Sequence, residues 1–188
     1  MDTKLVDVLN HALSNATLMQ SEAPWRLVIQ TSSGGAFAAG IDGSNDELLV
    51  VSANGQAVFD TATGSRIYRN REEAGYDREK LEARRMDKPG ESPIRMAGDD
   101  GGGLRQATSD GWTIDNLQIN WLTSYSILQQ PGASIYFLGS PWDRLGKDAS
   151  FRVLVKSESL PIAFGFSGSG KSLIWLDRSD LFIWNRHT

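Results

Sequence analysis

An internal repeat is the feature of this sequence that most constrains its fold. Residues 40–60, GIDGSNDELLVVSANGQAVFD, align without a gap on residues 165–185, GFSGSGKSLIWLDRSDLFIWN. Each copy reads as the end of one strand, a Gly/Ser turn, an apolar strand, a polar turn and a second apolar strand. Four positions are identical: Gly40/Gly165, Gly43/Gly168, Ser44/Ser169 and Leu48/Leu173. Because a repeat uses one supersecondary unit more than once, the sequence predicts repeated antiparallel β-hairpins.

The rest of the chain from residue 25 onward also favours β structure. Short apolar runs alternate with clusters of Gly, Ser, Asn and Asp, which is typical of an antiparallel meander. A weaker third copy of the repeat, at 104–115, sets Asp110-Gly111 opposite Asn54-Gly55, and both dipeptides favour tight hairpin turns. Strands are predicted at 26–30, 36–39, 48–51, 57–59, 66–68, 117–121, 134–138, 151–155, 162–166, 173–176 and 181–184.

Two segments depart from this β pattern. Residues 1–24 predict an amphipathic helix and linker, because apolar residues recur there at three-and-four spacing before Pro24 ends the pattern. Residues 66–88 hold eight Arg or Lys and six Asp or Glu, and 88–103 are rich in Gly. We therefore expect 70–103 to be a charged insertion, helical or mobile, that lies outside the β core.

The predicted architecture is a mainly β, single domain over residues 1–188. Its parts are the N-terminal helix and linker (1–24), a first β unit (25–69), the charged insertion with a Gly-rich loop (70–103) and the remaining β units (104–188). A chain of 188 residues can bury one sizeable core, and it has little room for a second domain of ordinary size.

The second copy of the repeat resembles a blade of a WD-repeat β-propeller. Residues 163–173, AFGFSGSGKSL, match the A-F-S-x-x-G-x-x-L entry of such blades, and the copies end in Phe59-Asp60 and Trp184-Asn185 where the family has Trp-Asp. At about 40–50 residues a blade, the resemblance implies about four propeller-like sheets, as a small closed ring or an open stack. A closed ring implies that Trp25–Gln30 pairs with 181–184 to complete the terminal blade.

Composition excludes several classes of protein. The chain has no Cys, so disulfides, thiolate catalysis and Cys-ligated metal sites are excluded. A net charge of −4 argues against nonspecific nucleic-acid binding, because phosphates would be repelled. No signal sequence or membrane span is recognisable, so we expect a soluble protein without membrane contact, most simply in the cytoplasm.

Residues 165–172, GFSGSGKS, satisfy the phosphate-loop pattern G-x-x-x-x-G-K-[ST]. This alternative assigns nucleotide binding to Gly165, Gly170, Lys171 and Ser172. A phosphate loop opens a helix, however, whereas the residues that follow have the pattern of a hairpin. The hairpin interpretation is the one we favour.

Catalytic and metal sites are not recognisable. Asp42 to Glu47 offer oxygens at alternate positions, as some calcium loops do, but the Gly and Glu of an EF-hand loop are missing. His11 and His187 lie near the two ends of the sequence, and no nucleophile motif is present. We therefore expect no enzyme activity, no metal and no cofactor.

The function predicted from these residues is a non-catalytic protein-binding module, of which an inhibitor or immunity-type protein that binds a more basic partner is one form. Its candidate contacts are the exposed turn Trp142, Asp143 and Arg144, because a large aromatic beside charge is a typical anchor, and the acidic loop Asp99 and Asp100. Two alternatives stay open: nucleotide binding at 165–172, and a small-ligand or carbohydrate site lined by Trp.

Overall fold

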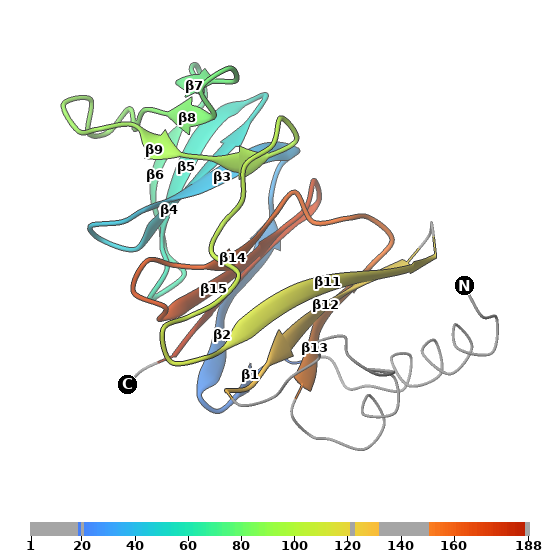
Figure 1. Cartoon of the computed structure of the whole chain (residues 1–188). Helices are drawn as coiled ribbons and strands as arrows, with labels where there is room; N and C mark the ends of the chain where they lie inside the picture. Colours follow the sequence, from blue (N-terminus) through green and yellow to red (C-terminus); the bar gives the residue numbers. More distant parts are fainter. Residues whose placement is uncertain (1–18, 20, 121–122, 132–150, 187–188) are drawn as a thin grey trace. The chain divides into compact units, whose positions relative to one another are not determined.

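The computed structural model describes residue 19 and residues 21–120, 123–131 and 151–186. This part of the chain is mainly β, as predicted, and contains no helix (Figure 1). It therefore also offers no helix that could span a membrane. The predicted N-terminal helix, the predicted strand 134–138 and both His residues lie outside the described residues.

Contacts divide the chain into two compact units, residues 1–20 with 107–160 and residues 21–106 with 161–188. The first unit holds one antiparallel sheet of order β11-β12-β13. Beside it, the buried Met19 donates its backbone N–H to the carbonyl of Val153 at 2.8 Å. The strands of this unit are β11 (Thr113–Asn120), β12 (Thr123–Gln129) and β13 (Phe151–Ser157).

The second unit holds three antiparallel sheets. The terminal sheet has the order β1-β2-β16-β15-β14, the meander sheet β10-β3-β4-β5-β6 and the small sheet β7-β8-β9. The strands are β1 (Ser21–Glu22), β2 (Trp25–Ser32), β3 (Ala36–Asp42), β4 (Glu47–Ser52), β5 (Gly55–Asp60), β6 (Arg66–Asn70), β7 (Tyr76–Asp77), β8 (Glu82–Ala83), β9 (Ile94–Arg95), β10 (Ala97–Gly98), β14 (Ala163–Phe166), β15 (Ser172–Leu176) and β16 (Asp180–Asn185).

The internal repeat is confirmed by the strand register. The β3-β4-β5 hairpins and the β14-β15-β16 hairpins pair the corresponding residues of the two copies. The matched pairs include Gly40↔Leu49 with Gly165↔Ile174, and Leu48↔Phe59 with Leu173↔Trp184. A register shift also falls at corresponding places, between Val58 and Phe59 and between Ile183 and Trp184. The two copies are therefore equivalent strand by strand.

The pairing predicted between Trp25–Gln30 and residues 181–184 is also confirmed. Strand β2 lies antiparallel to β16, with Ile29 opposite Ile183 and Leu27 opposite Trp184 (the blue and red strands of Figure 1). β2 thus takes beside β16 the place that β6 takes beside β5. No closed ring of blades is identified among the described strands, and ring closure of the WD-repeat kind stays a prediction.

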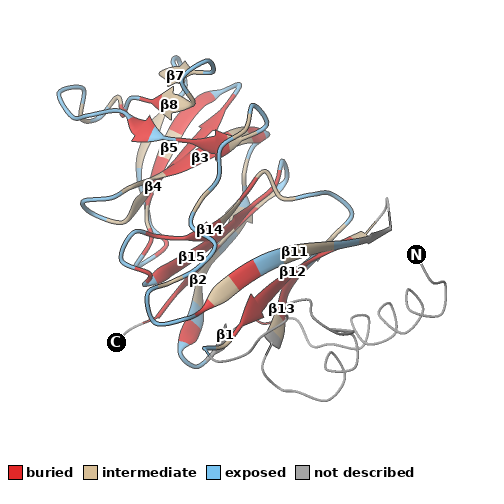
Figure 2. Cartoon of the chain, viewed as in Figure 1, coloured by how far each residue is buried: buried red, intermediate tan, exposed pale blue. Residues whose placement is uncertain are grey.

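The core explains why β4 and β15 are apolar at successive positions instead of alternating. One cluster of buried side chains joins the terminal and meander sheets and includes Leu48, Phe59, Ile174 and Ile183. A second cluster covers the other side of the meander sheet. A strand buried on both faces needs apolar residues in both orientations, and Figure 2 shows β4 and β5 largely buried.

The prediction that the charged insertion at 70–103 is helical and lies outside the β core was wrong. The described chain forms β7, β8, β9 and β10 there, and Ala83, Ile94 and Met96 pack on the meander sheet. Arg85, in the middle of the charged run, is only 3% exposed. Composition misled because a few apolar residues suffice to dock a segment, and because Asp87 within it and Asp42 and Glu47 outside it neutralise the buried Arg85.

Trp184 offers a test of the terminal sheet, because it is 1% exposed and its ring stacks on Phe182 at 5.6 Å between centroids. We expect Trp184→Ala to lower the free energy of unfolding by about 3–5 kcal/mol, measured by urea denaturation. Trp184→Phe should cost less, because the cavity is smaller and the indole N–H has no hydrogen-bond partner among the described residues. Deleting residues 181–188 should abolish folding, and a cooperative thermal melt of that truncated chain would contradict the central position of β16.

Candidate functional site

The predicted acidic contact residues are already neutralised by arginines of the same unit. Asp99 Oδ2 lies 2.7 Å from Nη2 of Arg178, and Asp100 Oδ2 lies 3.7 Å from Nε of Arg78. Both carboxylates are therefore less available to a basic partner than their sequence position suggested. Trp142, Asp143 and Arg144 lie outside the described residues.

The segment Gly165–Ser172 is a hairpin connection, as the favoured interpretation predicted. Gly165 belongs to β14 and Ser172 opens β15, so no helix follows the glycines. The Ser172 hydroxyl is buried and donates to Thr61 Oγ1 at 2.8 Å, whereas Lys171 is exposed. The hydroxyl that would bind magnesium in a phosphate loop is thus committed to a hydrogen bond inside the fold.

The glycines at 40 and 165, identical in the two copies, share a packing role. A Cβ on Gly40 would lie 2.5 Å from the carbonyl oxygen of Arg95, and one on Gly165 would lie 2.5 Å from that of Arg105. In both copies another segment of backbone crosses the first strand at this position. The glycine is needed for close approach, which gives it a reason that does not involve phosphate.

The Asp-rich turn Asp42–Glu47 uses its carboxylates inside the fold. Asp46 accepts hydrogen bonds from the hydroxyls of Ser167 and Ser169, so the corresponding turns of the two repeats contact each other. Asp42 Oδ1 accepts the backbone N–H and the hydroxyl of Ser44, at 2.9 and 2.7 Å. Within the described ranges, no group of three or more His, Cys, Asp or Glu could hold a metal ion.

Arg85 is the centre of a charge cluster on the meander sheet. Its Nη2 lies 2.5 Å from Asp87 Oδ2, and its Nη1 lies 3.4 Å from Asp42 Oδ2 and also contacts Glu47. Lys88 Nζ lies 3.1 Å from the same Glu47 carboxylate. Each charge in the cluster has an opposite charge beside it, so the cluster stabilises the docked segment and leaves no cation free for a ligand.

The electrostatics of this cluster follow from its contacts. Hydrogen bonds from Arg85 lower the pKa of the Asp87 carboxyl and outweigh the opposing effect of burial. For Asp42, burial raises the pKa, but hydrogen bonds from Ser44 and the positive charge of Arg85 together lower it by more. The pKa of Asp42 is therefore below its ordinary value. The pKa of Arg85 is raised, chiefly by its hydrogen bond to Asp87. Asp42, Asp87 and Arg85 are therefore ionised at neutral pH.

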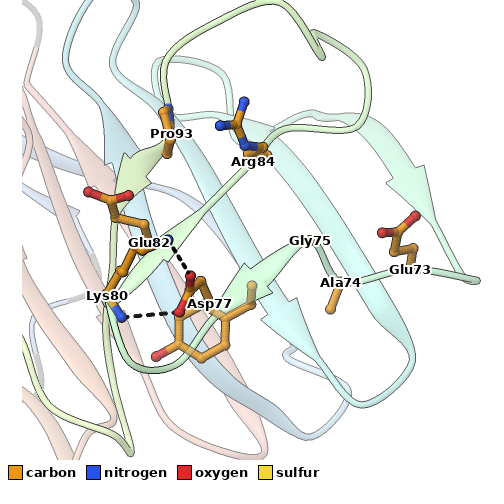
Figure 3. A pocket seen from close by; sticks show the side chains of 9 residues that line it. Glu73, Ala74, Gly75, Asp77, Lys80, Glu82, Arg84 and Pro93 are labelled. Carbon is orange, nitrogen blue, oxygen red and sulfur yellow. Dashed lines mark hydrogen bonds and ion pairs between the residues drawn. The ribbon is translucent and has the colours of Figure 1, made fainter.

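A pocket of about 390 Å³ lies on the small sheet (Figure 3). Its charged side chains are mixed in sign: Glu73, Asp77 and Glu82 against Lys80 and Arg84. Lys80 Nζ and Asp77 Oδ2 are 3.1 Å apart, and hydrogen bonds from Lys80 lower the pKa of Asp77. With both signs interleaved, this pocket selects neither an anion nor a cation.

The wall of this small-sheet pocket includes Tyr76, whose environment keeps its hydroxyl protonated. Burial raises the pKa of Tyr76, and the negative charge of Asp100 raises it further. The Tyr76 ring packs on Phe37, with 5.7 Å between ring centroids. Tyr76 thus serves to dock the small sheet on β3, and no feature of it points to acid–base chemistry.

A second, smaller pocket of about 130 Å³ lies where the meander sheet meets the terminal sheet, and we call it the arginine pocket. Its polar wall comes from the β2–β3 connection, the β4–β5 turn and β6: Ser32, Ser33, Ser52, Asn54, Arg66 and Arg69. Its apolar wall consists of Val50, Ala57, Phe59 and Leu181. No Asp or Glu lines it.

The two arginines of this pocket differ from Arg85 in what they contact. Within the described part of the chain, the Arg69 guanidinium donates to backbone carbonyls, those of Asn54 and Asn70 at 2.8 Å and that of Gln56 at 3.0 Å. Arg66 is exposed and forms no ion pair within the described residues. The pocket therefore carries positive charge that no carboxylate in its wall neutralises.

Sequence reasoning missed the arginine pocket. Both arginines belong to the predicted strand and charged run at 66–88. Acidic residues are close to them in sequence, and the sequence did not indicate that these acids lie away from the arginines in the fold. Only the pairing of β6 with β5 puts them on the face of Ala57 and Phe59. Residues three apart on a regular strand point to opposite faces, and only the register shift between Val58 and Phe59 brings both arginines to one face, so the sequence carried no signal for this site. No protein family, curated protein or solved structure matches this chain.

Lys171 and Ser172 test the hairpin interpretation as a matched pair. Lys171→Ala should change the free energy of unfolding by no more than about 0.5 kcal/mol, because the side chain is exposed. Ser172→Ala should cost about 1–3 kcal/mol, because it breaks buried hydrogen bonds with Thr61 and Asn185. Mg-ATP should not shift the melting temperature; a shift that Lys171→Ala removes would restore the phosphate-loop alternative.

The Arg85 cluster predicts a pH dependence of stability. Asp87 has a lowered pKa in the folded state against about 3.9 when unfolded, so its stabilising effect is present above about pH 4 and disappears as the pH falls through the folded-state pKa. Asp87→Asn should therefore be less stable by about 1–3 kcal/mol at pH 7, with a deficit that shrinks below pH 4 in urea denaturation.

Glu72→Gln is the control for this experiment, because Glu72 is exposed and lies outside the cluster. Its stability should follow that of the wild type at every pH. A deficit of Asp87→Asn that stays constant from pH 7 to pH 3 would show that the ion pair with Arg85 does not contribute.

Proposed function

We propose that this protein is a non-catalytic binding module that takes an extended, acidic segment of a protein partner along strand β6. The observation that carries the proposal is the combination of a free strand edge and an exposed apolar side chain. β6 is the last strand of the meander sheet, and Ile67 is 48% exposed. Among the described residues the other large hydrophobic side chain so exposed is Leu160.

Strand geometry supports this mode of binding. At the edge of an antiparallel sheet, every second residue directs its backbone N–H and C=O away from the neighbouring strand. A partner segment that adds there as a strand gains main-chain hydrogen bonds, while its side chains decide specificity. The arginines of β6 also discourage pairing between two copies of the chain, which keeps such an edge available without aggregation.

Charge indicates the chemistry of the partner. Arg66 and Arg69 lie on either side of Ile67 and Tyr68 and form no ion pair among the described residues, whereas Asp99 and Asp100 are paired with arginines. The surface around Ile67 therefore carries positive charge without a neighbouring carboxylate. This charge favours an acidic partner segment over the basic partner expected from composition. An inhibitor or immunity-type role, with the docked segment belonging to a toxin or an enzyme, is one form of this proposal.

A selection from a random peptide library on the immobilised full chain tests the proposal. We expect the enriched peptides to be acidic and extended, and to protect the amides of β6 in hydrogen exchange. Ile67→Lys should weaken binding of the selected peptide at least about tenfold, equivalent to about 1.4 kcal/mol, in a calorimetric titration.

Leu160→Lys is the matched control, because it replaces the other exposed apolar side chain, which lies in the first unit. Peptide binding should be unchanged in this variant. Basic consensus peptides, or equal losses in the Ile67→Lys and Leu160→Lys variants, would overturn the assignment of β6.

A further inference from the structure

We infer that the arginine pocket is a binding site for one small oxyanion, a phosphate or carboxylate group. This site is separate from the backbone edge of β6, although Arg66 borders both. Three features of the pocket carry the inference: uncompensated charge, an unpaired buried hydroxyl and limited size.

The charge of the pocket comes from Arg66 and Arg69. Arg69 is fixed by its bonds to the carbonyls of Asn54, Gln56 and Asn70, which orient the guanidinium without cancelling its charge. Arg66 is exposed and can turn toward a ligand. A guanidinium matches the geometry of carboxylate and phosphate oxygens, and two of them make a site that prefers an anion to a neutral group.

The unpaired hydroxyl belongs to Ser33. Its Oγ is buried, lines the pocket and has no hydrogen-bond partner among the described residues. A buried polar atom without a partner costs free energy, so an acceptor placed in the pocket would remove that cost. The hydroxyl can donate to an oxyanion from the wall of the pocket formed by the β2–β3 connection.

The other polar groups of the wall are partly engaged. Ser52 donates its hydroxyl to the carbonyl of Gly55 at 3.4 Å and accepts the N–H of Asn54 at 3.3 Å. Ser32 Oγ accepts the N–H of Gly34 at 3.3 Å. Asp180 pairs with Ser32 across the strands but does not line the pocket. Ser33 and the two arginines can therefore donate to a ligand, and so can the Ser32 hydroxyl and the Asn54 side-chain amide, which also line the pocket.

Size limits the ligand to a single group. The pocket has a volume of about 130 Å³, and one water molecule takes up about 30 Å³ of liquid. A phosphate or a carboxylate with its carbon fits this space, and the rest of a larger ligand would lie outside the pocket. The apolar wall of Val50, Ala57 and Phe59 excludes water on one side, which strengthens the attraction between the arginines and an anion.

Titration of the full-length protein with inorganic phosphate and, separately, with sodium acetate tests the inference. Binding is followed by NMR shifts of the backbone amides, with sodium chloride at equal ionic strength as the reference. We expect saturable shifts of residues 32–34 and 66–69 with at least one of the two anions. The anion that binds with the lower dissociation constant shows whether the site prefers a phosphate or a carboxylate group.

Arg66→Gln and Ser33→Val should each weaken anion binding at least about fivefold. Arg66 is exposed, so its substitution leaves the fold intact even if Ser33→Val disturbs the β2–β3 connection. Arg71→Gln is the matched control: Arg71 is exposed on the same stretch of chain but does not line the pocket, and its loss should leave binding unchanged.

Failure of this inference is distinguishable from failure of the proposed function. Ile67→Lys should weaken peptide docking at least about tenfold but should not weaken anion binding, since Ile67 does not line the pocket. The oxyanion site would be overturned if neither phosphate nor acetate gave larger NMR shifts than chloride. It would also be overturned if Arg66→Gln and Arg71→Gln weakened anion binding equally.

Discussion

The pairing of β2 with β16 is the constraint on which the rest of the second unit depends. These strands come from residues 25–32 and 180–185, and this ladder joins β2 and the edge strand β1 to the rest of the terminal sheet. The terminal sheet in turn supplies Ile174 and Ile183 to the cluster beneath the meander sheet. Bringing β2 and β16 together closes a loop of most of the chain, which costs conformational entropy before the contacts between the strands form. We therefore expect this sheet to form cooperatively.

The arginine pocket follows directly from that arrangement. One wall is the β2–β3 connection with Leu181 of β16, and the other is the face of β5 and β6. Neither sheet contains the site alone. Substitutions that loosen the β2–β16 ladder should therefore affect ligand binding from a distance, because they move one wall of the pocket relative to the other.

The sequence predicted the hairpins of both repeats, because these depend on local patterns and on one visible self-similarity, and the resemblance to a propeller blade implied the partner of the last strand. The register of the strands came only with the structure. The sequence did not predict the burial of Arg85, since the carboxylates of Asp42 and Glu47 that neutralise it lie far away in sequence. The arginine pocket was missed for the same reason: Ser33, Arg66 and Leu181 share no pattern along the chain. A high content of charged residues indicates an exposed segment only when each charged side chain is solvated by water and not paired with another side chain.

Glu47 and Ser172 occupy the same position in the two repeats, opposite Asp60 and Asn185. The first forms an ion pair with Arg85, whereas the second belongs to a network of buried hydroxyl and amide groups with Thr61. The two hairpins are thus interchangeable as backbones but not as sequences. A chimera with two copies of the first hairpin would place a carboxylate among hydroxyls, and one with two copies of the second would leave Arg85 with Asp87 as its remaining partner of the three carboxylates.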